Sequence, residues 1–390
     1  MPNILTINAG SSSIRFAVFE ISGRPSRVLD GKLERIGSPE ACLTVRHSGQ
    51  AAAQISIGPG RGVDSLVEWL RGQPVVAASA AVGHRVVHGM LHTAPEMLTA
   101  ELLAELRSIT PFDPEHLPRE IELIEALQRA YSKVPHVACF DTAFHRSMPG
   151  VATQLPIPRR FMAKGVRRYG FHGLSYTFLM QELTRVGGPA EAEGRVILAH
   201  LGSGASIAAV QGGRCVDTSM GFTPASGLVM GTRSGDLDPG LMSFLALTES
   251  MNAEQFQTMV SHESGLIGVS ETSADVRDLL GREAGDSRAR EALALFCYQA
   301  KKWIGSFAAV LGGVDTLVFA GGVGENAAPL RRRICDGLQF LGIEIDEAKN
   351  LRNAPRISSD AGAVVVRVIR TDEESIIADL TAGLLGITAK

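Results

Sequence analysis

Two segments of the chain, half a chain length apart, follow the same plan. Residues 4–20 (ILTINAGSSSIRFAVFE) and 196–213 (VILAHLGSGASIAAVQGG) each read as an apolar strand, a Gly/Ser turn and a second apolar strand. Aligning Gly10 with Gly202 separates the copies by 192 residues, about half of the 390-residue chain. This echo predicts two related domains, each opening with a β-hairpin whose tip is small and polar. Coincidence stays open at this point, because Gly/Ser hairpins are common.

The rest of the chain alternates short β-branched runs with helical stretches, a pattern typical of an α/β protein. Strands are expected at residues 4–7, 14–19, 77–82, 134–140, 196–201, 207–210, 316–320 and 363–368. Helices are expected near residues 99–109, 119–130, 175–186, 287–311, 327–341 and 373–385. Thr99 is expected to cap the first of these helices, and Gly386 to end the last one.

Composition narrows the class of protein. Hydrophobic residues make up 45% of the chain, charged residues 20%, and the formal net charge is −3, which favours a soluble two-domain protein. No uncharged apolar run approaches the ~18 residues of a membrane span, and the N-terminus lacks a signal pattern, so we expect a cytoplasmic protein without a membrane partner. The charge also argues against nucleic-acid binding. Five cysteines lie far apart without a CxxC pair, so neither disulfides nor structural zinc are expected.

Glycine is enriched, with 42 residues against a usual share of about 7%. The two Gly/Ser tips can aim backbone N–H groups at phosphate oxygens, and so can residues 320–326 (AGGVGEN), which follow an expected strand. Residues 322–327 also fit G-x-G-x-x-G/A, with Glu344 and Asp346 about 20 residues further on, so a dinucleotide site is an open alternative. There is no G-x-x-x-x-G-K-[ST] motif, which argues against a P-loop NTPase.

Charged residues in several short motifs are candidates for chemistry. Arg85 (GHRVVHG, 83–89) and Arg233 (GTRSGDLDP, 231–239) stand near glycines, where a guanidinium can hold a carboxylate or phosphate, or pair with a structural Asp. Asp141 ends an expected strand, where α/β proteins often place catalytic groups, although it could equally cap a turn. His172 lies between Phe and Gly, and a lone His is more often structural. Glu373 lies in a helix's first turn, which helix-dipole compensation alone explains.

Taken together, these motifs resemble the acetate kinase family, part of the acetate and sugar kinase/actin-like ATPase superfamily. The resemblance runs nearly end to end. It rests on residues 8–16 (NAGSSSIRF), 83–89 (GHRVVHG), 140–145 (FDTAFH), 169–173 (YGFHG), 200–204 (HLGSG), 231–239 (GTRSGDLDP), 321–326 (GGVGEN) and 371–374 (TDEE). So many motifs in one order favour the functional interpretations over the structural ones.

The resemblance implies an α/β fold of two duplicated actin-like (ribonuclease H-like) domains with a nucleotide cleft between them. The N-terminal domain is expected to comprise residues 1–146 and 374–390, so that the last helix packs back on it. The C-terminal domain, residues 147–373, would carry most of the nucleotide site and the interface of a homodimer.

Roles for individual residues are also implied by the resemblance. Arg85 and Arg233 match the pair that grips the carboxylate and the transferring phosphoryl group, with Asp141 between them and His172 as transition-state stabiliser. The substrate-binding positions are Arg85, Val87, Glu115, Phe171 and Pro224. The nucleotide-binding positions are Ser11, Ser13, Arg15, His200, Leu201, Gly202, Ser203, Gly204, Asp275, Val276, Arg277, Gly321, Gly322, Val323, Gly324 and Glu325. Asn8 and Glu373 match the positions associated with Mg²⁺, for which Mn²⁺ is an alternative.

Among the positions that depart from the family's pattern, three belong to the expected binding sites. Arg15 stands where lysine is usual and replaces a compact phosphate donor with a fork. Ser203 replaces an asparagine and shortens one contact to the nucleotide. Glu115, in PFDPEHLP (111–118), takes the place of a leucine that lines the acyl pocket. It either points to solvent or changes the preferred substrate to one that carries a hydroxyl or an amine.

The implied activity is the reversible, Mg²⁺-dependent transfer of phosphate from ATP to a short carboxylate, with acetate as first candidate and ADP and an acyl phosphate as products. A carboxylate is ionised at pH 7, so its attack on a γ-phosphoryl group needs no general base, but cations must bring the two anions together. Propionate, butyrate or a substituted acid are alternative substrates. A nucleotide-binding actin-like protein that has lost turnover is another alternative. Such an inactive family member would, however, be expected to have lost some of Arg85, Asp141, His172 and Arg233.

Overall fold

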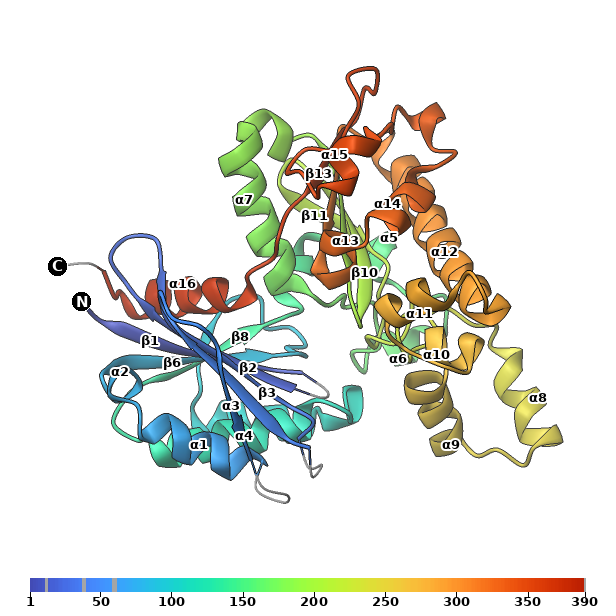
Figure 1. Cartoon of the computed structure of the whole chain (residues 1–390). Coiled ribbons are helices and arrows are strands. Elements are labelled where there is room, and N and C mark those ends of the chain that lie inside the picture. Colours follow the sequence, from blue (N-terminus) through green and yellow to red (C-terminus); the bar gives the residue numbers. More distant parts are fainter. Residues whose placement is uncertain (11–12, 37–39, 58–61, 389–390) are drawn as a thin grey trace. The chain divides into compact units, whose positions relative to one another are not determined.

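The computed structural model describes residues 1–10, 13–36, 40–57 and 62–388 (Figure 1). The chain divides into two compact units. Unit 1 comprises Met1–Ala143, Gly173–Phe178 and Asp372–Lys390, and unit 2 comprises Phe144–His172 and Leu179–Thr371. Neither unit is one continuous segment, because the chain passes between them four times. The domain limits expected from the family resemblance stay a prediction.

Unit 1 contains an eight-stranded sheet in the order β5-β4-β3-β2-β1-β6-β8-β7. Its strands are β1 (Asn3–Ala9), β2 (Ser13–Glu20), β3 (Ser26–Glu34), β4 (Cys42–His47), β5 (Ala53–Ser56), β6 (Ser79–Val86), β7 (Glu96–Met97) and β8 (His136–Phe140). β1 is antiparallel to β2 and parallel to β6, which is parallel to β8. The parallel strands bring their carboxyl ends to one edge of the sheet, which is where α/β proteins bind ligands.

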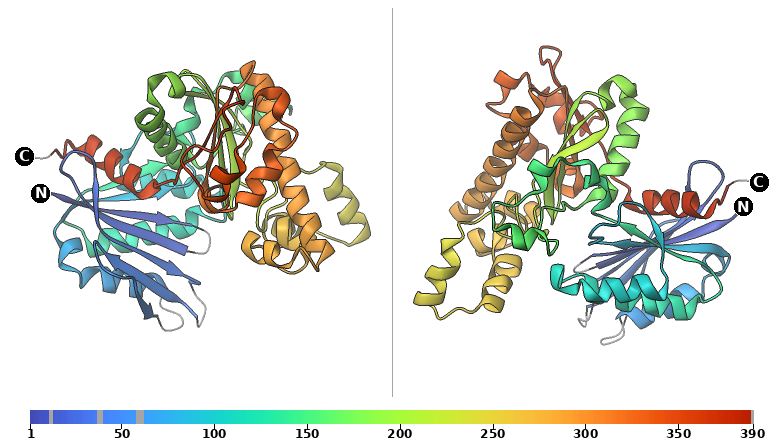
Figure 2. Two further views of the ribbon diagram at one scale, coloured as in Figure 1. Left: turned by 45° about the horizontal axis from the view of Figure 1, so that its top comes forward. Right: turned by 180° about the vertical axis from the view of Figure 1, so that it is seen from behind.

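Helices cover both faces of this sheet, as a buried sheet requires. They are α1 (Gly62–Arg71), α2 (Pro74–Ala77), α3 (Ala100–Ser108), α4 (Leu117–Ala130) and α16 (Glu373–Leu385). Because side chains alternate along a strand, Leu5 packs with α1 and α4 while its neighbour Ile4 packs with α16. Figure 2 shows α4 and α16 on opposite faces. α16 packs so closely that a Cβ added at Gly83 would lie 2.3 Å from the Thr381 hydroxyl oxygen.

Unit 2 contains a five-stranded sheet in the order β11-β10-β9-β12-β13. Its strands are β9 (Arg195–Leu201), β10 (Ala205–Gln211), β11 (Arg214–Thr218), β12 (Thr316–Ala320) and β13 (Val365–Val368). β9 is antiparallel to β10 and parallel to β12, which is parallel to β13. This repeats the arrangement β3-β2-β1-β6-β8 of unit 1, with the hairpins β1–β2 and β9–β10 in equivalent places. The duplicated α/β fold expected from the sequence echo is therefore confirmed.

The helices of unit 2 include α12, which packs its buried stripe against β9 and β10. In chain order the helices are α5 (Gly150–Thr153), α6 (Arg159–Met162), α7 (Gly173–Ala192, whose first six residues belong to unit 1), α8 (Gly240–Thr248), α9 (Ala253–Thr258), α10 (Gly265–Ser270), α11 (Val276–Arg282), α12 (Ser287–Leu311), α13 (Gly321–Asn326), α14 (Ala328–Cys335) and α15 (Glu347–Leu351). Across the described residues, no helix has both the length and the apolar character needed to cross a membrane.

Two helix ends lie where the sequence predicts them, whereas one helix runs further than predicted and one expected loop is helical. The Thr99 side chain accepts a hydrogen bond from the Leu102 N–H, and Gly386 ends α16 with a positive φ of 63°, both as predicted. The helix expected at 175–186 instead runs to Ala192 through a break at Gly188, which has φ 79°. The segment 321–326, a candidate phosphate-binding loop, forms the short helix α13. Its backbone N–H groups therefore belong to a first helical turn.

Candidate active site

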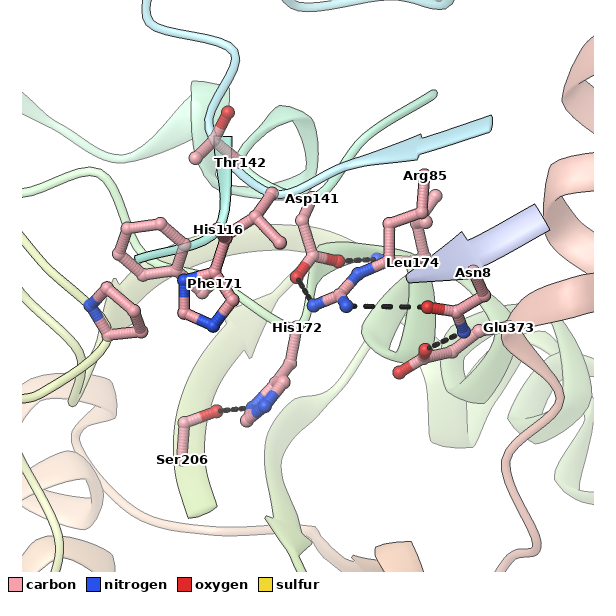
Figure 3. A network of polar contacts seen from close by, with 12 residues as sticks. Asn8, Arg85, His116, Asp141, Thr142, Phe171, His172, Leu174, Ser206 and Glu373 are labelled. Carbon is pink, nitrogen blue, oxygen red and sulfur yellow. Dashed lines mark hydrogen bonds and ion pairs between the residues drawn. The ribbon is translucent and has the colours of Figure 1, made fainter. Parts of the chain in front are cut away.

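Arg85 and Asp141 form an ion pair at the carboxyl edge of the unit 1 sheet (Figure 3). Arg85 lies near the end of β6 and Asp141 directly follows β8. The Arg85 Nη2 donates to Asp141 Oδ2 at 2.8 Å, and the Asp141 carboxylate is 0% exposed. The other carboxylate oxygen accepts the Leu174 N–H at 3.2 Å, in the first turn of α7. Both structural alternatives raised by the sequence, an Arg–Asp pair and a helix cap, are thus present, and neither removes Arg85 from the edge where ligands bind.

Asn8 connects this pair to the first turn of α16. Its Nδ2 donates to Glu373 Oε2 at 2.8 Å and to Glu374 Oε1 at 3.1 Å, while its Oδ1 accepts from Arg85 Nη1 at 3.4 Å. Burial raises the pKa of both glutamates, and the nearby Arg85 partly opposes this for Glu373. A cation added beside these two adjacent carboxylates would stabilise their ionised forms.

Two of the three residues of the first hairpin that are expected to contact phosphate lie within the described structure. Arg15 is exposed on β2 and pairs with Asn8 in the β1–β2 register, so its guanidinium shares the electrostatic environment of Glu373. Ser13 begins β2, and its carbonyl accepts the Gly10 N–H at 2.8 Å. Ser11 lies outside the described residues. Their contacts to a nucleotide stay a prediction.

A buried carboxyl that the sequence reasoning missed, Glu120, lies next to this network. It is on α4 and is 3% exposed, and its Oε2 accepts the N–H of Val87, an expected wall residue of the acyl pocket, at 3.0 Å. Burial raises its pKa to about 8, although Arg85 opposes the rise. A usable signal was present in the sequence, because Glu120 falls on the apolar face of α4 between Leu117 and Leu123.

The raised pKa of Glu120 predicts how this residue affects stability. The folded pKa of about 8 lies above the ordinary 4.5, so the folded state binds the proton more tightly. The protonated carboxyl therefore contributes stability that is fully present below pH 4.5 and is lost as the pH rises from 4.5 through 8. Glu120→Gln keeps an acceptor for Val87 but cannot ionise, so its unfolding free energy should rise relative to the parent protein across this range. Urea unfolding at several pH values between about 5 and 9 measures the difference. The exposed neighbour Glu122→Gln is the control, and parallel pH profiles for parent and Glu120→Gln would contradict the prediction.

Glu115, the main departure in the expected acyl pocket, lies in the turn before α4. It is half-buried between Asp113 and His116, whose Oδ1 and Nδ1 atoms lie 2.8 Å apart in the interior. The turn therefore has a fixed buried side, and Glu115 is only partly in solvent. Its contact with a substrate stays a prediction.

His172 is the centre of a second cluster, in unit 2. Its backbone is left-handed, with φ 59° and ψ 26°, directly before α7. Its Nδ1 shares a 2.8 Å hydrogen bond with the Ser206 hydroxyl (Figure 3). Its ring stacks on His200 with centroids 4.3 Å apart. A Cβ added at Gly204 would lie 3.3 Å from His172 Nε2 and 3.6 Å from Arg233 Nη1. The glycine tip of the β9–β10 hairpin thus lies against both candidate catalytic side chains of this unit.

Arg233 also contacts one expected wall residue of the acyl pocket. Its Nη1 donates to the Pro224 carbonyl at 3.3 Å. A second expected wall residue of unit 2, Phe171, immediately precedes His172 and is 1% exposed. The structure thus places each of these two wall residues beside a candidate catalytic residue, while their contact with an acyl group stays a prediction.

The expected nucleotide segments of unit 2 converge on the same hairpin tip. A Cβ at Gly321, which has φ 75°, would lie 2.6 Å from the Leu201 carbonyl, so only glycine permits α13 to approach β9 this closely. The Ser203 backbone carbonyl accepts a hydrogen bond from the Gly231 N–H at 3.0 Å. A Cβ at Gly231 would lie 3.2 Å from the carbonyl of Ala274, which precedes the 275–277 segment at the start of α11. Three segments far apart in sequence thus meet, although their binding of a nucleotide stays a prediction.

A buried guanidinium lies next to α13, one of the segments expected to bind the nucleotide. Arg331, on α14, is 0% exposed, and its Nη1 donates to the carbonyls of Gly324 and Glu325 at 2.8 and 3.0 Å, near the end of α13. Its remaining donors contact Asn350 and Asn353. Burial without a carboxylate partner at hydrogen-bond distance lowers the pKa of Arg331 to about 10, so it stays charged at neutral pH and fixes the helix that follows β12.

A comparison with family models decides the classification. The model of the acetokinase family matches residues 3–379. The chain belongs to the acetokinase family. This confirms the resemblance seen in the sequence motifs and leaves no support for the dinucleotide-binding alternative at residues 322–327.

Individual acetokinase relatives cover nearly the whole chain. An acetate kinase of Rhodopseudomonas palustris is 42% identical over 385 residues, 96% of each chain, and a propionate kinase of Citrobacter rodentium is also 42% identical, over 96% of this chain and 95% of the relative. Among solved structures, an acetate kinase of Porphyromonas gingivalis aligns with TM-score 0.88 at 33% identity, covering 99% of this chain and 100% of the other. A propionate kinase of Francisella tularensis aligns with TM-score 0.90 at 33% identity, covering 97% and 99%. The duplicated actin-like fold is therefore that of this family.

Proposed function

We propose that this protein transfers the γ-phosphoryl group of ATP to a short carboxylate, acetate first, and runs the reaction in both directions. The observation that carries the proposal is the contact of the Gly204 hairpin tip with His172 and Arg233, because it places two donors for developing negative charge beside an expected phosphate loop. Acetate and propionate kinases among the relatives support the same reaction class.

The proposed chemistry needs cations and positioning more than it needs a base. Acetate is already ionised at neutral pH, so direct in-line attack requires no proton transfer. Arg85, held by Asp141, would orient the carboxylate in unit 1. Arg233 and His172 in unit 2 would stabilise charge on the transferring group.

The residues expected to hold a divalent cation fit Mg²⁺ by their chemistry. Glu373 and Asn8 offer hard oxygen ligands, and burial raises the pKa of Glu373, an effect that a bound cation would oppose. Within the described part of the chain, no group of three or more His, Cys, Asp or Glu side chains forms a complete metal cage. This suits Mg²⁺, with Mn²⁺ as an alternative, since Mg²⁺ in kinases takes most of its ligands from water and the nucleotide and there neutralises phosphate charge.

The acid that the enzyme prefers is a separate question from its reaction class. Acetate and propionate kinases match this chain at the same 42% identity, so similarity does not separate these substrates. The test is ATP-dependent acyl phosphate formation, trapped as the hydroxamate with Mg²⁺ present, across acetate, propionate, butyrate, glycolate and glycine. Turnover with acetate supports the proposal as stated. Absence of turnover with every acid despite ATP binding would overturn it and favour a non-catalytic nucleotide sensor.

Replacing Glu115 with leucine should lower the KM for acetate. A carboxylate beside a bound acetate repels it by about 1–4 kcal/mol at a separation near 4 Å, depending on the effective dielectric. Steady-state kinetics of Glu115→Leu measures the effect, with Glu122→Gln on the following helix as control. An unchanged KM for acetate would mean that Glu115 does not face the acyl group.

We also place this enzyme in the cytoplasm, where ATP is available, and infer that it works as a homodimer that pairs through α8 of unit 2. The sequence of α8, GLMSFLALT, is almost entirely apolar, yet it contains no buried residue, and Phe244 and Leu247 are 60% and 86% exposed. A second copy is the partner that such a face fits, since symmetric dimers use the same apolar patch on both subunits.

Leu247→Glu should therefore shift the protein from dimer to monomer, because it places two like charges in the centre of a symmetric apolar contact. Size-exclusion chromatography with light scattering measures the mass. Leu91→Glu, at a 74% exposed leucine of unit 1, is the matched control and should remain dimeric. A dimeric Leu247→Glu variant would place the interface elsewhere.

A further inference from the structure

A buried histidine that the proposed chemistry does not use, His145, lies beneath the loop that carries His172. It belongs to the 3₁₀ turn at Ala143–Ser147 and is 1% exposed. Its Nε2 lies 2.9 Å from the Phe171 carbonyl oxygen, and its Nδ1 lies 3.2 Å from the Cys215 Sγ. The imidazole thus connects three segments of unit 2: its own turn, the loop before α7, and β11.

These two contacts fix the tautomer of His145. A carbonyl oxygen only accepts, so Nε2 must carry the proton that is donated to Phe171. In a neutral ring, Nδ1 is then an acceptor, and it lies 3.2 Å from the Cys215 thiol, which also lies at donor distance, 3.4 Å, from the Asp217 carbonyl. Burial raises the pKa of Cys215 and keeps it a thiol, which preserves that donor. The hydrogen bond from His145 Nε2–H to the Phe171 carbonyl therefore has a fixed direction, whereas the single thiol proton of Cys215 has two acceptors within reach.

The loop packs directly on the imidazole. A Cβ added at Gly170, which has φ 78°, would lie 2.6 Å from both Cγ and Cδ2 of His145. Two residues later the backbone of His172 is left-handed, a conformation that costs a non-glycine residue about 1–2 kcal/mol and persists only where its surroundings impose it. The Ser206 hydroxyl holds the ring of His172, whereas His145 holds the residue immediately before it.

We propose that His145 is a positioning residue for phosphoryl transfer: its Nε2–H holds the Phe171 carbonyl, and through it the left-handed backbone that presents His172. His145 itself does not touch the substrate. This inference rests on the proposed function, because it gives the position of His172 a catalytic value.

Two substitutions at position 145 separate positioning from simple packing. His145→Leu fills much of the space without a donor, whereas the amide nitrogen of His145→Gln can reach the Phe171 carbonyl. His145→Leu should lower kcat by about 10- to 100-fold, the range expected for a misplacement of about 1 Å, and leave the KM for ATP nearly unchanged. His145→Gln should recover most of kcat.

Ser147→Ala is the matched control, since Ser147 lies in the same turn and its hydroxyl donates to the Cys215 carbonyl at 2.8 Å without involving the imidazole. It should leave kcat unchanged. Nitrogen-15 NMR of the parent protein should show a neutral His145 protonated on Nε2, and His145→Leu should shift the His172 resonances while His145→Gln should not. Equal kcat values in the Leu and parent proteins, equal loss in the Leu and Gln variants, or an Nδ1–H tautomer would overturn the inference.

The NMR measurements also distinguish this inference from the proposed function. If the parent protein phosphorylates no acid, the proposed function fails, and the His172 resonances of the two variants still decide whether His145 holds that loop. If the parent is active and the His172 resonances do not respond to His145→Leu, the proposed function stands and the inference fails.

Discussion

Arg233→Ala should lower kcat for acyl phosphate formation by at least about 100-fold, the loss seen when one preorganised transition-state donor is removed. Arg233 Nη1 is near Gly204 at the hairpin tip and donates to the Pro224 carbonyl, so the guanidinium is positioned before any substrate binds. The deletion removes a cation from a reaction between two anions, and the effect should therefore fall on kcat more than on the KM for ATP.

Steady-state kinetics in both directions, with the melting temperature as a check on folding, measures the effect of Arg233→Ala. Arg214→Ala is the control, since Arg214 is an exposed arginine of the same unit on β11. Turnover near that of the parent enzyme in a folded Arg233→Ala variant would remove Arg233 from the catalytic machinery.

Arg85→Met should abolish measurable turnover and also destabilise unit 1. Asp141 is 0% exposed and its Oδ2 lies 2.8 Å from Arg85 Nη2, so the variant removes this guanidinium from a fully buried carboxylate. Removing one partner of a buried ion pair typically costs about 3–5 kcal/mol. Activity falls for a different reason, because the cation expected to orient the substrate carboxylate is lost.

A second variant separates these two effects of Arg85→Met. Arg85→Met/Asp141→Leu removes both charges and should regain much of the unfolding free energy, but no activity. Arg46→Met breaks the more exposed Arg46–Asp30 pair of the same unit and should change stability by at most about 1 kcal/mol. Chemical unfolding and the hydroxamate assay provide both readouts. An Arg85→Met protein as stable as the parent, or one that turns over normally, would contradict the roles assigned to the pair.

Local patterns in the sequence were enough to predict the repeated fold. The hairpins β1–β2 and β9–β10 follow from alternation of apolar residues around Gly/Ser tips, which is information carried within each segment. The convergence of Gly202 and Gly321 is of another kind. It was expected only through the family resemblance, because no local pattern states which loops will meet.

Hydrogen-bond partners that lie far apart in the sequence were not predictable in this way. Glu120 bonds to Val87 across 33 residues, His172 to Ser206 across 34, and His145 to Cys215 across 70. A charged residue on an apolar helix face marks Glu120 as unusual, but its partner is set by the packing of α4 on β6. The left-handed backbone of His172 likewise depends on the loop beneath it and not on its own preference.

The division of unit 1 among three chain segments has a consequence for synthesis on the ribosome. Ile4, Phe19 and Ala81 form one apolar face of the sheet, and the residues that cover it, such as Ala378, lie near the C-terminal end of the chain. Although β1 is made first, that face has no cover until nearly all of the chain has been translated. Unit 2 ends at Thr371 and can complete its core earlier. The unit that begins the chain should thus be the last to finish folding, and a chain shortened before α16 should expose that face to chaperones and proteases.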